Sequence, residues 1–415
     1  MSTTTASPER ENDRSIAALT MLGHGLFHYF EMAIPILLVV WIDSFPTGVE
    51  VAGLIVAIGF APIGIAALPG GMLSDRYGPG VVLLGSIAGM SLGFGALALA
   101  PSIYGVGLAL AVWGLFAGVY HPAGMSLIST GAASRGTIFA YHGMAGNLGT
   151  ALGPFVAATL LLVFEWRVVA GLLALPGVAA FMYGLSIDFD PTAAVDEPAE
   201  AAADERDETP LIMRGRELLH SLFPIVLAIV VFDGLFYRGV TAYLPRILRE
   251  LSAMPALTIT DALVGVNVGD YIFVGLLVVG IAGQWVGGTL SDRIAVETGL
   301  TGGFALLGLF SLLFVPVAGV GFAPLLLVSA LLGFFLFFVQ PMYQVAVAVH
   351  TPAATRGLSY GVTYLGEFGI GALGIALGGV LLGSYSTRSF FVVIAGFAFL
   401  ATFLAVLLGV KSRRS

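Results

Sequence analysis

Cysteine is absent from the 415-residue chain, and charged residues are scarce. Without a thiol the protein has no disulfide, no thiolate metal site and no cysteine nucleophile. Only 10% of the residues are charged, against about 25% in a soluble protein, whereas 58% are hydrophobic. No soluble core absorbs that much apolar sequence, so the composition indicates an integral membrane protein with the lipid bilayer as its surroundings.

Two chemical signatures are missing as well. The six histidines show no H-E-x-x-H spacing, and there is no phosphate-binding Walker loop. We therefore expect no enzyme and no ATP-driven pump, and neither a cofactor, a metal ion nor a nucleic acid as a partner. The polar start MSTTTASPERENDR also lacks the apolar core and small-residue cleavage site of a signal peptide.

Long apolar runs dominate what is present. A helix needs about 20 apolar residues to cross a bilayer. Twelve runs qualify, and they are too long and continuous for barrel strands. The predicted fold class is an all-α membrane protein with twelve transmembrane helices, at 16–42, 48–73, 79–100, 102–129, 137–164, 167–187, 218–249, 261–290, 300–320, 323–349, 357–384 and 388–410.

Basic residues predict the orientation. With both termini in the cytoplasm, twelve Lys and Arg residues lie inside. Only four lie outside, at Arg167, Arg246, Arg249 and Arg388. Because cytoplasmic loops carry the excess of positive charge, this bias predicts cytoplasmic termini in a multi-pass protein of the cell membrane.

One segment differs from the rest. Residues 188–210 carry nine acids and one arginine, which predicts a mobile, solvated linker. The expected organisation is a polar tail (1–15), an N-terminal six-helix bundle (16–187), an acidic cytoplasmic linker (188–216), a C-terminal six-helix bundle (217–411) and a basic tail (412–415).

The two halves repeat each other. GGMLSDRYGPG (70–80) matches GGTLSDRIAVE (287–297), and GLFHYFEMAIPILL (25–38) corresponds to GLFYRGVTAYLPRIL (234–248). HPAGMSLISTGAASRG (121–136) corresponds to QPMYQVAVAVHTPAATRG (340–357), with Pro in the helix and Arg-Gly beyond it. Paired repeats of this kind place a binding site at their interface, near the bilayer midplane.

The motif G-x-L-S-D-R-x-G resembles the signature of the major facilitator superfamily. The second copy, the two six-helix halves and the long central loop strengthen this resemblance, which covers the whole chain. It implies two pseudo-symmetric bundles in which the first, fourth, seventh and tenth spans line a central path. The chain departs from the signature at Pro79 and Gly80, where the family usually has basic residues. The HPAG stretch more loosely resembles bacterial fosmidomycin-resistance efflux proteins.

Polar residues within the spans mark the same path. An ionisable side chain in mid-membrane costs a few kcal/mol unless it faces a cavity or a partner. The third, sixth, ninth and twelfth spans have none in their interiors, as expected of helices facing lipid, while His24, His28 and Glu31 share one helix face. The predicted substrate and proton path comprises His24, His28, Glu31, His121, His142, Asn147, Asp233, Tyr237, Arg238, Gln340, Gln344 and Glu367.

Several roles stay open at this point. Glu31 and Asp233 are the candidate proton carriers, or else structural partners of Arg238. Arg238 keeps its proton and suits an anionic group such as a carboxylate, phosphate or phosphonate. The alternative role of Arg238 is a structural ion pair with Glu31 or Asp233. His121 either packs beside the kink at Pro122 or lines the cavity, binding substrate or relaying a proton.

The loops that follow the second and eighth spans predict a gate. The resemblance implies a cytoplasmic latch that holds the outward-open state, in which Asp75 pairs with Arg135 or Arg356. A carboxylate there could also cap a helix, or the charges could serve topology alone. The predicted gating residues are Asp75, Arg76, Arg135, Asp292, Arg293 and Arg356.

The fifth span suggests a direction of transport. Its GNLGTALGPFVAA (146–158) resembles the motif of proton-coupled drug antiporters, with Ala157-Ala158 in place of the trailing Gly-Gly. Small residues also let membrane helices pack closely. We expect a monomeric secondary transporter that exports a small organic solute by proton antiport and alternating access. The alternatives are uptake of an organic anion by proton symport, a channel, or a sensor that has lost transport.

Overall fold

The computed structural model describes residues 8–194, 211–251, 267–351 and 356–413, and this part of the chain contains helices and no strand. Each of the twelve predicted runs overlaps helical structure, although residues 261–266 of the eighth lie outside the described part. The helices of the first half are α1 (Pro8–Ser44), α2 (Val49–Tyr77), α3 (Pro79–Ala96) with the short 3₁₀ extension η1 (Leu97–Leu99), α4 (Ile103–Gly131), α5 (Arg135–Leu160) and α6 (Trp166–Ser186).

The second half begins with a short helix, α8 (Leu211–His220), most of which precedes the predicted run 218–249. It continues with α9 (Phe223–Glu250), α10 (Val268–Ser291), α11 (Val296–Ala318) and α12 (Phe322–His350). The eleventh predicted run forms α13 (Arg356–Tyr364), a π-helical turn η4 (Leu365–Ile370) and α14 (Leu373–Ser384), and α15 (Thr387–Ser412) ends the bundle.

Within the described residues, eleven helices are long and apolar enough to cross a membrane. The protein is therefore a multi-pass membrane protein. α5 is not among the eleven, although it is 26 residues long, because glycines and polar residues such as His142 and Asn147 make it less apolar. The twelfth predicted membrane crossing, that of α5, thus stays a prediction.

The Pro79-Gly80 departure from the family signature has a local structural reason. α2 ends at Gly78, whose φ of 85° is a conformation that residues with a Cβ rarely adopt. Pro79 then occupies the first turn of α3, where the missing N–H costs nothing and the fixed φ favours a helix. This Gly-Pro junction turns the chain directly from α2 into α3.

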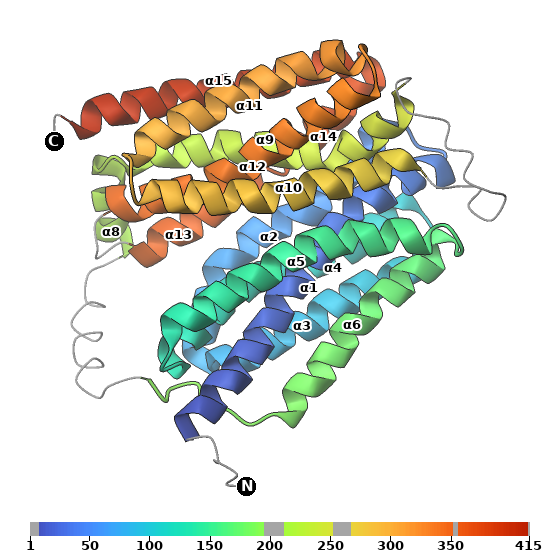
Figure 1. Cartoon of the computed structure of the whole chain (residues 1–415). Helices are drawn as coiled ribbons and strands as arrows, with labels where there is room; N and C mark the ends of the chain where they lie inside the picture. The colour runs from blue at the N-terminus through green and yellow to red at the C-terminus, as the bar shows by residue number, and fades with distance from the viewer. Residues whose placement is uncertain (1–7, 195–210, 252–266, 352–355, 414–415) are drawn as a thin grey trace, which may run out of the picture.

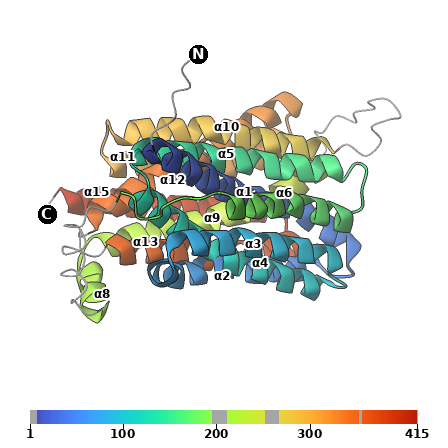
Figure 2. The same cartoon turned by 90° about the horizontal axis from the view of Figure 1, so that it is seen from below.

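The same helix pairs pack together in each half (Figure 1). α1 packs on α5 as α9 packs on η4 and α14, and α2 packs on α4 as α10 packs on α12. α3 packs on α6 as α11 packs on α15. Between the halves, α2 contacts η4 and α14, α5 contacts α10, and α1 contacts α9. α1 begins and α15 ends at the same end of the bundle, where α8 also lies (Figures 1 and 2).

The start of the acidic linker is held against this end of the first half. Asn12 donates to the carbonyl of Gly131 at 2.9 Å and accepts from the backbone N–H of Asp190 at 2.7 Å. Arg135 Nη2 donates to the carbonyl of Ala194 at 2.7 Å. Hydrogen bonds from Thr192 also lower the pKa of the exposed Asp190 carboxyl. The start of the predicted linker is thus bonded to α1 and α5, and residues 195–210 lie outside the described part.

Candidate functional site

A cavity of about 290 Å³ lies between the two halves. Eleven of the twelve predicted path residues line it: His24, His28, Glu31, His121, His142, Asn147, Tyr237, Arg238, Gln340, Gln344 and Glu367. The twelfth, Asp233, is completely buried, and its Oδ2 accepts a hydrogen bond of 2.9 Å from Gln340 Nε2. The structure thus gathers side chains from α1, α4, α5, α9, α12 and η4 around one polar space.

This space continues toward one end of the bundle. A second cavity of about 400 Å³ shares His121, Tyr343, Gln344 and Glu367 with the first and extends to α13, past Tyr360. That is the end at which α1 begins and α15 ends (Figure 1).

The halves meet at the opposite end of the bundle. Ser384 Oγ on α14 donates to Glu50 Oε1 on α2 at 3.1 Å, and the hydroxyls of Thr159 on α5 and Tyr271 on α10 lie 3.4 Å apart. The cavity therefore leads toward the end carrying the termini and is closed by inter-half contacts at the other.

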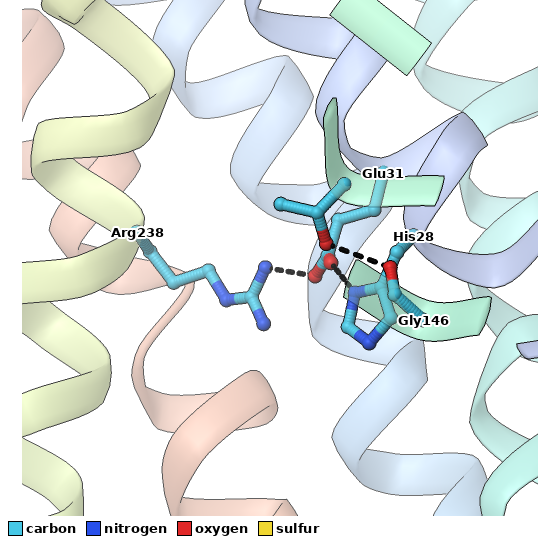
Figure 3. A network of polar contacts seen from close by, with 5 residues as sticks. His28, Glu31, Gly146 and Arg238 are labelled. Atoms are coloured by element: carbon cyan, nitrogen blue, oxygen red, sulfur yellow. Dashed lines mark hydrogen bonds and ion pairs between the residues drawn. The ribbon is translucent and has the colours of Figure 1, made fainter. Parts of the chain in front are cut away.

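A buried ion pair joins the two halves beside the cavity. Arg238 Nη1 reaches from α9 and donates to Glu31 Oε1 on α1, and His28 Nδ1 lies 2.7 Å from Glu31 Oε2 (Figure 3). The Arg238 and Glu31 side chains are only 3% and 1% exposed. The guanidinium also stacks over Phe368, with its central carbon 4.3 Å from the ring centre. Such stacking suits arginine and partly replaces lost hydration.

The pairing decides between the predicted partners of Arg238. Arg238 pairs with Glu31 from the other half. It does not pair with Asp233, which lies only five positions away on the same helix. Asp233 Oδ1 and Arg238 Nε are both buried with no hydrogen-bond partner in the described part of the protein. Buried polar atoms without a partner are rare in proteins, so these two mark a strained point of the site.

Four of the six histidines form a cluster on the first half. His24 Nδ1 lies 2.7 Å from the backbone carbonyl of His142, and the two rings stack with centres 3.8 Å apart. The centre of the His121 ring lies 5.2 Å from that of His24 and 5.4 Å from that of Tyr364, on which it stacks. His121 thus lines the cavity and packs at the same time, next to Pro122 inside α4.

Several polar residues at the site are absent from the predicted path, among them Thr150, Tyr343 and Tyr364, which line the cavity. Gln284 on α10 lines the cavity. The Tyr120 hydroxyl donates to the carbonyl of Thr20 at 2.6 Å and lies 3.2 Å from His142 Nε2. Gln284 carries an uncharged amide, which gives a weaker signal in an apolar span than an ionisable group does. Tyr120 gave no signal, since a tyrosine in an apolar run is typical of a packed core.

Of the two predicted latch pairs, the one between Asp75 and Arg135 is not made in this structure. Asp75, Arg76, Asp292 and Arg293 are exposed, and Asp75 makes no ion pair among the described residues. Arg135 bonds instead to the linker carbonyl at Ala194, and the side chain of Arg356 lies outside the described part.

Helix capping at this surface comes from α1 rather than from Asp75. Asp13 Oδ1 and Oδ2 accept from the backbone N–H groups of Ala133 and Ser134 at 2.8 and 2.9 Å, directly before α5. A carboxylate there also complements the positive end of the α5 dipole.

The glycine motif of α5 has a packing role. A side chain at Gly149 would collide with the backbone oxygen of Gly25, and one at Gly153 would collide with that of Tyr29. The motif therefore lets α5 approach the backbone of α1, as small residues do between membrane helices.

These features define the class of the protein: a membrane carrier with a polar cavity between two repeated helix bundles. The model of the Major Facilitator Superfamily matches residues 20–372 and 252–415, and the chain belongs to this superfamily. The resemblance of G-x-L-S-D-R-x-G to the superfamily signature is confirmed. No curated protein matches the sequence.

Solved structures of transporters share the fold at low identity. The inward-open xylose transporter XylE from E. coli aligns with a TM-score of 0.72 at 14% identity, covering 95% of each chain. A bacterial homologue of the human lysosomal transporter Spinster, inward-facing and occupied, gives 0.71 at 14% identity over 99% of this chain and 98% of its own. A mutant of the nucleoside transporter NupG gives 0.70 at 13% identity over 95% and 99%.

Proposed function

We propose that the protein is a proton-coupled secondary transporter that carries a small organic anion across the cell membrane by alternating access. The observation that carries this proposal is the buried Glu31–Arg238 pair, which joins the two halves at the wall of the central cavity. Arg238 supplies a permanent positive charge for a carboxylate, phosphate or phosphonate group. Glu31 supplies an acid that can be neutralised by a proton.

The pair couples proton and anion through competition. A solute anion that binds Arg238 displaces the Glu31 carboxylate, which would then be an unpaired charge in mid-membrane. Because an unpaired buried charge costs several kcal/mol, Glu31 takes up a proton when the anion binds. Anion and proton are therefore bound together and released together, as in a symporter.

The cavity also suggests the direction of access. With both termini in the cytoplasm, as the basic residues predict, the cavity opens inward and the contacts of Glu50 and Tyr271 close the outer end. The two predicted bundles would rock about the path between them, and formation of the Asp75 latch would accompany closure of the inner end. Two of the similar solved structures are described as inward-open or inward-facing, which agrees with this assignment.

Proton antiport with export of the solute is the second candidate. The Gly149-x-x-x-Gly153-Pro154 motif and the HPAG stretch favour it, although packing of α5 on α1 accounts for the glycines. In antiport the solute and the proton bind alternately. A cationic solute would do this by replacing the proton at Glu31. The two candidates therefore differ in the charge of the solute and in the sign of the proton flux.

Liposomes that hold a pH-sensitive dye separate these candidates. Candidate carboxylates, phosphonates and cationic compounds are added outside in turn. Uptake of an anion with acidification of the interior supports symport, whereas solute uptake with alkalinisation supports antiport. Saturable counterflow without any proton flux would contradict proton coupling altogether.

Two carboxamide variants assign the proton. Glu31→Gln should abolish the solute-driven proton flux, because the amide cannot exchange a proton. Asp233→Asn is the matched control, since Asp233 lies outside the cavity lining. Loss of proton flux in Asp233→Asn alone would transfer the coupling role from Glu31 to Asp233.

A further inference from the structure

We propose that His24, His28 and His121 form a binding site for a divalent transition-metal ion of the Zn²⁺, Co²⁺ and Ni²⁺ class, inside the central cavity. The expectation from the sequence was no metal, because no short histidine motif is present. The site is assembled from two helices, α1 and α4, and does not depend on the nature of the organic solute.

The three side chains have the separation that a shared ion requires. One ligand atom from each lies within 4.8 Å of the other two. A tetrahedral zinc ion, with Zn–N bonds of about 2.0–2.1 Å, needs nitrogens about 3.4 Å apart. The nitrogens must therefore approach one another by at most about 1.4 Å, which small rotations of the side chains provide. Imidazole nitrogen favours Zn²⁺, Co²⁺ and Ni²⁺ over Mg²⁺ and Ca²⁺, which prefer oxygen ligands.

Hydrogen bonds prepare two of the rings for metal binding. The Nδ1 atom of His24 faces the carbonyl oxygen of His142, and that of His28 faces Glu31 Oε2, both at 2.7 Å. A carbonyl oxygen, and a carboxylate that is already paired with Arg238, only accept hydrogen bonds. Nδ1 therefore carries the proton in both rings, and Nε2 keeps its lone pair for a metal. Carbonyl and carboxylate partners of this kind orient metal-binding histidines and raise their basicity.

Ring stacking and access complete the site. His142 stacks on His24, and Tyr364 stacks on His121, so neighbouring rings hold two of the three ligands. All three histidines line the 290 Å³ cavity. With three protein nitrogens bound, the fourth tetrahedral position would stay open and face this space. Zinc sites that exchange their fourth ligand have this arrangement.

The test is direct metal binding to the purified full-length protein. The protein is prepared without a histidine tag, stripped with a chelator, and titrated with Co²⁺, whose visible absorption bands report coordination, and with Zn²⁺ by calorimetry. We expect one ion per chain and bands of tetrahedral Co²⁺. His24→Ala, His28→Ala and His121→Ala should each weaken binding by about tenfold or more.

His220→Ala is the matched control, because His220 lies on α8, is exposed, bonds to the carbonyl of Arg216 and does not line the cavity. Its metal affinity should stay within twofold of the wild type. Unchanged affinity in all three site variants, or the absence of Co²⁺ and Zn²⁺ binding to the wild type, would overturn the site.

A measurement on the wild type guards against variants that fail to fold. Modification by diethyl pyrocarbonate is followed by mass spectrometry with and without Zn²⁺. Zn²⁺ should protect His24, His28 and His121 and leave His220 reactive. Equal modification of the three histidines with and without Zn²⁺ contradicts the proposal. None of these readouts requires transport, so failure of the metal site and failure of the proposed anion transport are seen separately.

Discussion

Glu31 and Arg238 lose nearly all of their hydration, since their side chains are 1% and 3% exposed. Removing two such ions from water costs several kcal/mol for each, and their mutual attraction regains this only with good geometry and further hydrogen bonds. His28 and the ring of Phe368 supply those additional contacts. In the proposed mechanism, a proton on Glu31 and a solute anion on Arg238 replace this pairing.

Breaking this pair on one side should destabilise the protein. Arg238→Met leaves the Glu31 carboxylate buried and unpaired, which should lower the free energy of unfolding by about 3–5 kcal/mol. The double variant Glu31→Gln, Arg238→Met removes both charges and should regain most of that loss. Thermal unfolding in detergent measures both effects, and counterflow of the anion should be absent in both variants. A double variant as unstable as Arg238→Met would show that the unpaired charge is not the cause.

At the scale of elements, glycines set how closely α2 and α14 approach at the closed end. A Cβ on Gly53 would meet the hydroxyl of Tyr243, the backbone of Gly379 and the carbonyl of Ile375. Because these atoms are mostly backbone, they have little room to yield. The closed end therefore depends on the absence of a side chain at this position.

Gly53→Leu should wedge the closed end open. The thiol of a Thr241→Cys probe, in the small cavity beside Glu31 and Arg238, then becomes reactive to a maleimide added outside. The native chain has no cysteine, so the probe is the only thiol. Gly85→Leu on α3 is the control, since no atom lies within 4 Å of a Cβ there. Equal labelling of the introduced thiol in both leucine variants would argue against this closure.

The latch can be tested at the same scale. Asp75→Asn removes the carboxylate that would hold the inner end closed, so the outward-open population should fall. A Tyr360→Cys probe, in the inner part of the cavity, should label faster in inside-out vesicles. Asp43→Asn, an exposed acid at the far end of α1, should change nothing. An unchanged rate in Asp75→Asn would leave Asp75 with a topological role only.

At the scale of the whole molecule, α5 decides the number of crossings. It packs against α1 and α10 as a spanning helix would, yet it is not among the eleven helices that are apolar enough to cross a membrane. Its polar residues face the cavity rather than lipid, and hydropathy averaged over a whole helix does not separate the two faces.

Labelling of single cysteines in intact cells should establish the topology. A membrane-impermeant maleimide should modify cysteines introduced at Ser44 and Val163 and leave those at Tyr77 and Ala133 unmodified until the cells are permeabilised. All four positions are exposed in the structure. Ala133 and Val163 flank α5, so labelling of both from one side would refute its crossing. Labelling of the two sets from the reversed sides would place the termini outside.

Much of the candidate site was predictable from the sequence. Polar residues stand out in apolar spans because an ionisable group is costly in lipid, and this alone selected eleven residues that line one cavity. The proposed metal site was not predictable in this way, since His121 joins His24 and His28 only through the packing of α4 against α1. The same holds for the cap that Asp13 provides to α5.

The sequence by itself determined the membrane class, the positions of the helices, the internal repeat and the polar path. These follow from hydropathy and helical period, which are local properties of the chain. Only the tertiary structure decided that Arg238 pairs with Glu31, 207 positions away, rather than with Asp233 on its own helix. It also decided that Gly149 and Gly153 of α5 face the backbone of α1. The physical reason is that distances between helices depend on how side chains pack across them, which spacing along one helix does not specify.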